Sequence, residues 1–143
     1  MLPDLIRGRD APRSSRCAAS GDFDGDGRLD LMVNNFNDYP YYFKNEFSPR
    51  HYLAFRLRGT RSNRDAVGAL VKLHLGDGMM VRQVHCTGGY LSQSSKTIHF
   101  GLGDRTQIRE VEIHWPSGAQ QTLPPPEIDR LHEITEPEPS NDE

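Results

Sequence analysis

The chain has 143 residues and a mass of 16.2 kDa, enough for one hydrophobic core with an appended element. Apolar residues make up 35% of it, and no apolar run approaches the roughly 20 residues of a membrane-spanning helix, so no membrane span is predicted. The net charge is −3, and residues 136–143 carry four negative charges, so the remainder is nearly neutral (−3 + 4 = +1). This balance argues against a nucleic-acid partner. The acidic end from Glu136 onward is expected to be solvated, with residues 137–143 as a disordered tail.

Residues 1–19 are predicted to be an N-terminal segment rather than a signal peptide, because they hold several arginines and no apolar stretch. Cys17, near its end, and Cys86 form no CxxC or other zinc pattern. We expect buried free thiols, and a disulfide between the two remains open.

The motif DFDGDGRLD at residues 22–30 carries the clearest chemistry, because it places carboxylates at loop positions one, three, five and nine. Calcium takes six to eight oxygen ligands, which alternating acidic residues on a glycine-rich loop supply, whereas magnesium demands a stricter octahedron. The predicted ligands are the side chains of Asp22, Asp24, Asp26 and Asp30 and the backbone carbonyl of Arg28. The alternative is an ordinary Asp/Gly-rich surface turn.

This loop is not an EF-hand, because loop position twelve is Val33 where an EF-hand has a bidentate glutamate. The residues that follow are short, apolar-rich and end in two asparagines. They predict a strand rather than a helix.

Strand patterns continue along the chain, while helical signals are weak. Leu53, Phe55 and Leu57 are expected to face one side of a strand, and Ala54, Arg56 and Arg58 the other. The Asp-Gly pair at residues 77–78 predicts a hairpin between two further strands. Trp115 shares a strand face with Val111 and Ile113 and is expected to be buried. The predicted strands are residues 29–34, 41–45, 53–58, 70–75, 79–86, 96–100 and 109–115, with a last one at 120–123 or 131–134.

Many short strands at this spacing predict an all-β fold. Residues 51–136 are expected to form an antiparallel β-sandwich or barrel-like domain, and residues 20–47 a calcium-loop β-hairpin before it. Eight of the twelve aromatic residues lie between positions 36 and 55. Tyr39, Tyr41 and Tyr42 are therefore candidate contacts for a sugar or a protein partner, although packing between hairpin and sandwich would also explain the cluster.

Two family resemblances follow from these motifs. Residues 18–31, AASGDFDGDGRLDL, resemble the calcium loop of an FG-GAP (VCBS) propeller repeat. Residues 58–69, 88–94, 99–103 and 115–118 resemble the signature segments of the ASPIC and UnbV domain. The resemblance implies an extracellular or periplasmic, calcium-binding, adhesion-like protein without established catalytic activity, in which this domain ends a longer secreted β-propeller.

The chain departs from that pattern because it holds one calcium-loop repeat, whereas a propeller typically needs about four to eight blades. We interpret the hairpin as a partial propeller blade and the chain as the C-terminal part of a longer protein. The alternative is a hairpin reused as a cap on the sandwich. An incomplete blade would expose a strand edge at residues 29–34 or 41–45. The chain is therefore expected to self-associate or to bind a partner through residues 29–47.

The predicted function is that of a non-catalytic interaction module with a protein or glycan partner. The alternatives are a carbohydrate-binding module and an accessory domain of a secreted enzyme. Arg64 and Asp65 offer opposite charges on a polar turn and are candidate partner contacts, unless the turn only shapes the fold.

His74, His99 and His114 fall on outward strand faces, so a three-histidine zinc site is an alternative. No GxSxG, HExxH or P-loop motif is present, and no enzyme is predicted.

Overall fold

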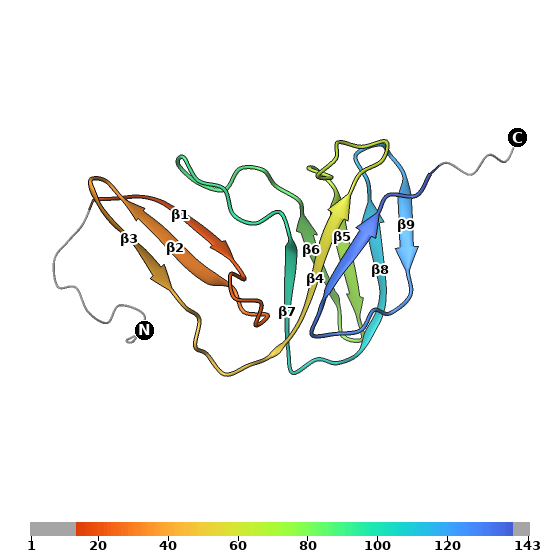
Figure 1. Ribbon diagram of the computed structural model, residues 1–143. Helices are drawn as coiled ribbons and strands as arrows, with labels where there is room; N and C mark the ends of the chain where they lie inside the picture. Colours follow the sequence, from red (N-terminus) through yellow and green to blue (C-terminus); the bar gives the residue numbers. More distant parts are fainter. Residues whose placement is uncertain (1–13, 139–143) are drawn as a thin grey trace, which may run out of the picture. The chain divides into compact units, whose positions relative to one another are not determined.

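The computed structural model describes residues 14–138 (Figure 1). Within that range the regular structure consists of ten strands and no helix, so no described helix is long and apolar enough to cross a membrane. The all-β prediction is confirmed. The strands fall into two compact units. The first comprises residues up to 47 together with 87–95, and the second comprises residues 48–86 and those from 96 onward.

The first unit contains one antiparallel sheet in the order β1-β2-β3. Its strands are β1 (Ser15–Gly21), β2 (Asp30–Asn35) and β3 (Asp38–Phe43). The two predicted hairpin strands correspond to β2 and β3. Strand β1 was not predicted, because the small and polar residues of Ser15–Gly21 show no apolar alternation. Most of this strand lies within residues 1–19, which were expected to be an N-terminal segment outside the hairpin. A propeller blade has four strands, one more than this sheet.

Because β2 pairs with β1 on one side and β3 on the other, the expected free edge at residues 29–34 is wrong. Among the described residues the edge strands of this sheet are β1 and β3, and β3 contains part of the other segment predicted to have a free edge, residues 41–45. Pro40 within β3 has no backbone N–H and is a residue type typical of sheet edges.

Residues 87–95 leave the second unit and pack in the first. The Ser95 N–H donates to the Ser20 carbonyl of β1 at 3.1 Å, and the Ser20 N–H donates to Ser94 Oγ at 3.2 Å. Between Gly89 and Ser92, which pair with each other, the chain turns tightly. Residues 88–94, the second of the four segments with the ASPIC and UnbV resemblance, therefore lie against β1.

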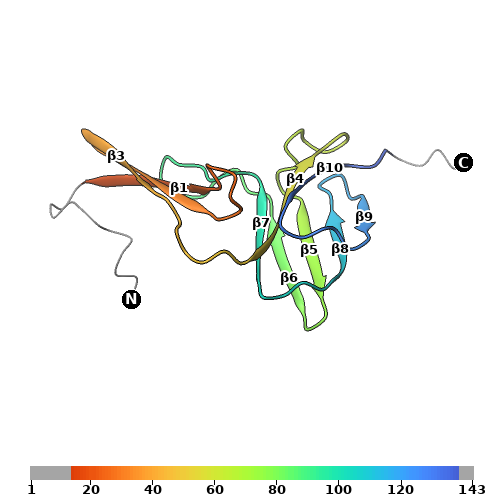
Figure 2. The ribbon, with the colours of Figure 1, turned by 60° about the horizontal axis from the view of Figure 1, so that its bottom comes forward.

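The second unit contains two separate sheets, so its described strands do not form a closed barrel (Figure 2). One sheet has the order β10-β4-β7 and the other β6-β5-β8-β9. β10 pairs with β4 in parallel, whereas the other strand pairs among the described residues are antiparallel. Both segments proposed for the last strand form strands, one in each sheet. The strands are β4 (His51–Arg58), β5 (Leu70–Leu75), β6 (Met79–Gln83), β7 (Ile98–Gly103), β8 (Ile108–His114), β9 (Gln120–Leu123) and β10 (Leu131–Thr135).

The hydrophobic core lies in this second unit, and both of its sheets supply it. The predicted alternation is confirmed in β5, where every second residue is buried, including Leu73. In β4 the inward residues Leu53, Phe55 and Leu57 are buried as predicted, but Ala54, expected on the outward face, is buried as well. Trp115 is also buried as predicted, and its Nε1–H donates to Gln121 Oε1 at 3.2 Å. Phe55 contacts Phe100 of β7 edge to face at 6.1 Å between ring centroids.

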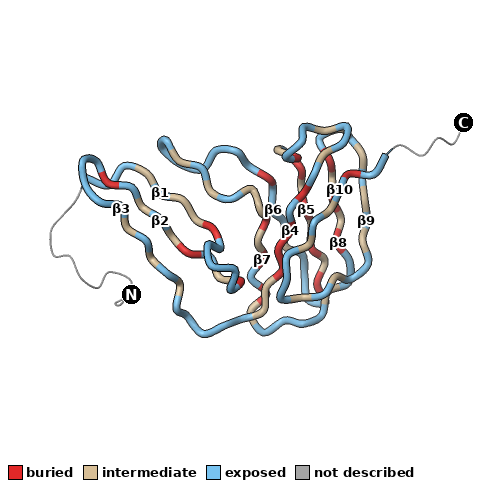
Figure 3. Tube along the Cα trace, in the orientation of Figure 1, coloured by how far each residue is buried: buried red, intermediate tan, exposed pale blue. Residues whose placement is uncertain are grey.

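The first unit has no comparable core among its described residues (Figure 3). Its buried positions are Gly21, Gly27, Asp30 and Asn35, and none of these is a large apolar side chain. A sheet of three strands normally needs a buried hydrophobic face for independent stability. This unit therefore gains little stability from apolar burial within itself.

Glu136 corrects the expectation of a solvated acidic end, because it is only 1% exposed. Its Oε2 accepts the backbone N–H groups of Thr60, Arg61 and Ser62 at 2.8–3.0 Å, and its Oε1 accepts the hydroxyls of Ser62 and Ser117. Burial alone would raise the pKa of Glu136, but these hydrogen bonds outweigh it and lower the pKa to about 2. Successive N–H groups form an anion-binding concavity that composition cannot reveal. Residues 139–143 lie outside the described residues.

The two cysteines do not form a disulfide in the structure. Cys17 on β1 is half-buried, and Cys86 is exposed, so the expectation of buried thiols is wrong. Cys86 lies two residues after the buried Val84, in a stretch from residue 85 to residue 91 in which every residue is exposed.

Candidate metal centre

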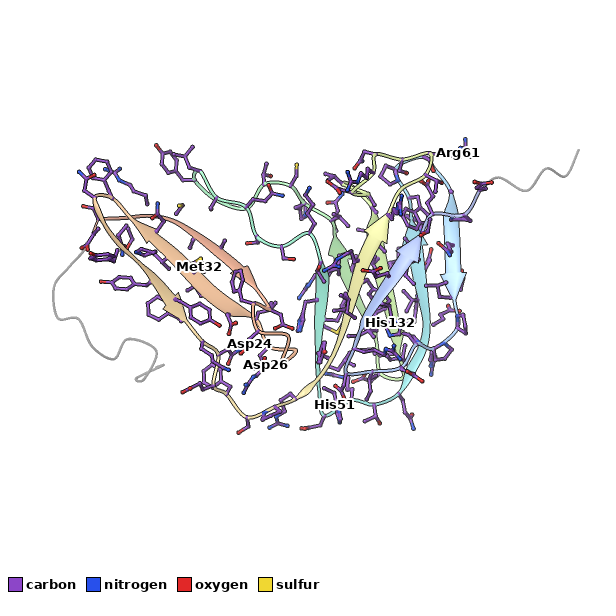
Figure 4. The ribbon with its side chains drawn as sticks, in the orientation of Figure 1. Asp24, Asp26, Met32, His51, Arg61 and His132 are labelled. Atoms are coloured by element: carbon purple, nitrogen blue, oxygen red, sulfur yellow. The ribbon has the colours of Figure 1, made fainter. Side chains whose placement is uncertain are left out.

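The acidic motif forms the loop between β1 and β2 (Figure 4). Carboxylate oxygens of Asp22, Asp24 and Asp26 lie within 4.8 Å of one another, and all three residues are exposed. Gly25 and Gly27 adopt φ values of 78° and 84°, a left-handed conformation that glycine allows without a steric penalty. The alternation of acidic residues with glycine thus brings three carboxylates to one place.

The Asp22 carboxylate organises this loop from within. Its Oδ1 accepts the N–H groups of Gly25 at 2.8 Å and Asp26 at 3.1 Å, and its Oδ2 accepts that of Gly27 at 2.9 Å. Asp26 Oδ1 accepts the Arg28 N–H at 2.9 Å. The backbone is therefore already folded around the carboxylates.

Two cationic side chains lie against the acidic cluster. The Arg28 guanidinium donates to Asp26 Oδ2, and this bond lowers the pKa of Asp26 to about 2. Lys44, one residue beyond β3, forms an ion pair with Asp24 Oδ2, which raises the pKa of Lys44. These cations partly neutralise a loop that would otherwise repel itself.

Asp30 has different surroundings from the other three aspartates, because it is only 2% exposed. Its Oδ1 accepts the Asn45 N–H at 2.8 Å, and its Oδ2 accepts the Tyr42 hydroxyl at 2.8 Å and the Phe23 N–H at 3.4 Å. Burial favours a raised pKa for Asp30, yet these bonds lower it, and the bond to Asp30 raises the pKa of Tyr42 to about 12. Asp30 thus ties the loop to the end of β3.

The donor set fits a hard divalent cation. Its three clustered carboxylates offer only oxygen atoms as ligands, which is the ligand type that such a cation prefers. Two positively charged side chains, Arg28 and Lys44, already pair with this cluster. Asp22, Asp24 and Asp26 would hold the ion. Coordination by Asp30 and by the Arg28 carbonyl stays a prediction.

The three candidate tyrosines differ in their exposure and surroundings. Tyr39 is 77% exposed and Tyr42 is 47% exposed, whereas Tyr41 is half-buried against Phe43 at 5.7 Å between ring centroids. Since successive strand residues point to opposite faces, Tyr41 and Tyr42 are not on one surface. The three tyrosines therefore do not form a single surface on which one sugar could stack.

The candidate pair Arg64 and Asp65 lies in the second unit, in the connection from β4 to β5, and both residues are exposed. Asp65 forms an ion pair with Lys96 at 2.5 Å, and this hydrogen bond lowers its pKa. The Asn63 side chain also holds the loop, because it bonds the N–H and the carbonyl of Val67, both at 2.8 Å. These contacts give the loop a clear structural role, and a ligand contact stays a prediction.

The structure does not bring the three predicted zinc-binding histidines together, so that alternative is wrong. His99 lies on β7 and stacks on Tyr52, whereas His74 and His114 lie in the other sheet. His74 and His114 both contact Glu112, which Lys72 also contacts at 3.2 Å. The strand register places Lys72 directly opposite Glu112, a pairing that the sequence alone did not reveal.

A sequence profile of the family described as ASPIC and UnbV matches residues 59–141, more than half of the chain. The chain belongs to the ASPIC and UnbV family. Cartilage acidic protein 1 from Mus musculus is 32% identical over 124 residues, which cover 82% of this chain and 19% of that protein. Cartilage acidic protein 1 from Homo sapiens is 33% identical over 102 residues, which cover 68% of this chain and 15% of that protein. The chain therefore spans less than a fifth of the length of these curated relatives.

The similarity to the mouse protein extends upstream of the ASPIC and UnbV match. Residues 59–143 make up 85 of the 143 residues (143 − 58 = 85), or about 59%, so coverage of 82% must include part of residues 1–58. Part of the first unit's sequence is therefore shared with this relative together with the ASPIC and UnbV domain.

Proposed function

We propose that this chain is a non-catalytic, calcium-binding interaction module and the C-terminal part of a longer extracellular β-propeller protein. The observation that carries the proposal is a cluster of three carboxylates directly upstream of an ASPIC and UnbV domain. Clustered carboxylate oxygens are the ligands that a hard cation such as Ca2+ prefers. The same chain has similarity to Cartilage acidic protein 1 beyond the ASPIC and UnbV domain itself.

Two observations support a longer protein. The chain spans 15–19% of the two mammalian relatives. In addition, the three-stranded sheet has no fully buried large apolar side chain among its described residues, as expected of a repeat that relies on its neighbours for a core. Further repeats of a propeller would provide those neighbours.

An extracellular location suits the chemistry of the loop. A loop without the position-twelve glutamate is expected to bind calcium weakly, near 10⁻⁴–10⁻³ M as in extracellular modules. Such a site fills where calcium is abundant. The relatives' name refers to cartilage, a tissue rich in extracellular matrix.

A glycan-binding role is the second candidate, and the exposure of Tyr39 favours it. An aromatic ring that is 77% exposed offers a face on which a sugar can stack. A glycan array with the wild-type chain and the Tyr39→Ser variant would test this role, since loss of a hit in the variant would assign it to this ring.

Calcium titration by calorimetry tests the main proposal. The wild-type chain should bind one ion, and Asp26→Ala should abolish binding because it removes a carboxylate from the cluster. Asp77→Ala is the matched control, since Asp77 is an exposed carboxylate that pairs with Arg105 outside the loop. Unchanged binding in Asp26→Ala would show that the loop is misassigned.

A further inference from the structure

The carboxylates of the metal loop already have protein partners, and two of these are full positive charges. Among the described residues, Asp22 accepts only backbone N–H groups, but Asp24 is paired with the Lys44 ammonium and Asp26 with the Arg28 guanidinium. Backbone N–H groups can remain in place beside a bound cation, because a carboxylate oxygen has two lone pairs. An ammonium or guanidinium beside the same carboxylate is instead repelled by a metal ion.

Arg28 and Lys44 already neutralise half of the loop's negative charge. Asp22, Asp24, Asp26 and Asp30 carry −4, and Arg28 with Lys44 carries +2, which leaves the loop at −2. A divalent ion would add two further positive charges within a few ångströms of the existing pair. At such distances repulsion between like charges is substantial even near a protein surface.

Both cations also connect the loop to residues 44–47, the segment that leads to the second unit. Lys44 belongs to this segment, and Arg28 Nη1 donates to the Phe47 carbonyl at 2.7 Å. Asn45 is held differently, because its own donors are neutral: its N–H donates to the Asp30 carboxylate and its side-chain Nδ2 donates to the Leu29 carbonyl at 3.2 Å.

We propose that Lys44 and Arg28 are displaceable counter-cations, so that a divalent ion in the loop releases residues 44 and 47 while Asn45 remains attached. This inference rests on the proposed calcium binding and adds a consequence for the rest of the chain. Occupancy of the loop then controls how firmly residues 44–47 are held against it within the first unit.

The test measures calcium affinity by calorimetry in the full chain and in Lys44→Met, which keeps the length of the side chain and removes its charge. Loss of a competing exposed ion pair should raise the affinity about fivefold. Lys96→Met is the matched control, because Lys96 forms a similar exposed pair with Asp65 in the second unit and changes the net charge equally. The control should leave the affinity within about twofold of wild type.

Two readouts separate displacement from a merely structural effect. The difference between Lys44→Met and wild type should shrink as the salt concentration rises from about 0.02 M to about 0.5 M, because salt screens exposed charges. The NMR signal of the Arg28 Nε–H, which is bonded to Asp26, should shift or broaden on addition of calcium. The Asn45 amide should stay protected from exchange.

The outcomes distinguish the two proposals. Equal or weaker calcium affinity in Lys44→Met, or an unchanged Arg28 signal at saturation, overturns the counter-cation inference while calcium binding stands. If the wild-type chain binds no calcium, both the inference and the proposed calcium function fail.

Discussion

Glu136 offers the sharpest test of how the second unit is held together. Glu136→Ala removes the acceptor of three backbone N–H groups and two hydroxyls, all at a position that is 1% exposed. Hydrogen bonds to a charged group contribute about 1.5–3 kcal/mol each, but the freed donors lie near the surface, where water replaces part of the loss. We expect the free energy of unfolding to fall by about 3–4 kcal/mol.

Glu136→Gln should cost less, for a reason visible in the geometry. Oε2 faces only N–H donors, so the amide oxygen can take its place, while the amide NH2 can donate to the hydroxyls of Ser62 and Ser117 at Oε1. The variant therefore loses mainly the charge, since charge-assisted hydrogen bonds are roughly twice as strong as neutral ones. The expected loss is about 1–2 kcal/mol.

The pH dependence gives an independent check. The pKa of Glu136 is about 2 in the folded protein, below its ordinary value of 4.5. A lowered folded-state pKa stabilises the fold fully above pH 4.5, and the stabilisation is lost as the pH falls from 4.5 toward 2. The stability difference between wild type and Glu136→Gln should shrink over that window.

Urea unfolding followed by tryptophan fluorescence measures these differences. Trp115 is the chain's one tryptophan and is buried in the second unit, so its emission reports on that unit. Glu138→Gln is the control, because Glu138 is an exposed acid two residues away and should change stability by less than about 0.5 kcal/mol. Two results would refute the assigned role of Glu136. One is a change in the free energy of unfolding of less than about 0.5 kcal/mol in Glu136→Ala at pH 7. The other is a pH dependence of stability in Glu136→Gln that equals that of wild type.

Three further outcomes are expected. Leu73→Ala, in the core of the second unit, should lower the free energy of unfolding by about 2–5 kcal/mol in the same urea assay; a change under about 1 kcal/mol would contradict its burial. Gly27→Ala should weaken calcium binding in calorimetry, because φ is 84° there, whereas Gly76→Ala, with no atom within 4 Å of an added Cβ, should not; equal effects would count against the loop geometry. Amide hydrogen exchange should be faster in β1, β2 and β3 than in β4 and β5, because the first unit lacks a buried apolar core among its described residues; equal protection would contradict this reasoning.

Local patterns in the sequence were sufficient to predict the core strands and the clustering of acidic side chains on one loop. The alternation in β5 determines which side chains are buried, because side chains in a strand alternate between the two faces. The Asp-Gly turn at residues 77–78 correctly predicted the antiparallel pairing of β5 with β6. The clustering of Asp22, Asp24 and Asp26 likewise follows from their spacing on a short glycine-containing loop.

Only the tertiary structure decided the features that depend on residues far apart in the chain. β1 lacks an apolar pattern and is a strand because β2 pairs with it. β10 joins β4 in parallel across a separation of 77 residues, as between Leu131 and Ala54. Glu136 is buried because the N–H groups of residues 60–62, more than 70 positions earlier, surround its carboxylate. Such pairings leave no periodicity in the local sequence, since the partner that satisfies each polar group is brought close only when the chain folds.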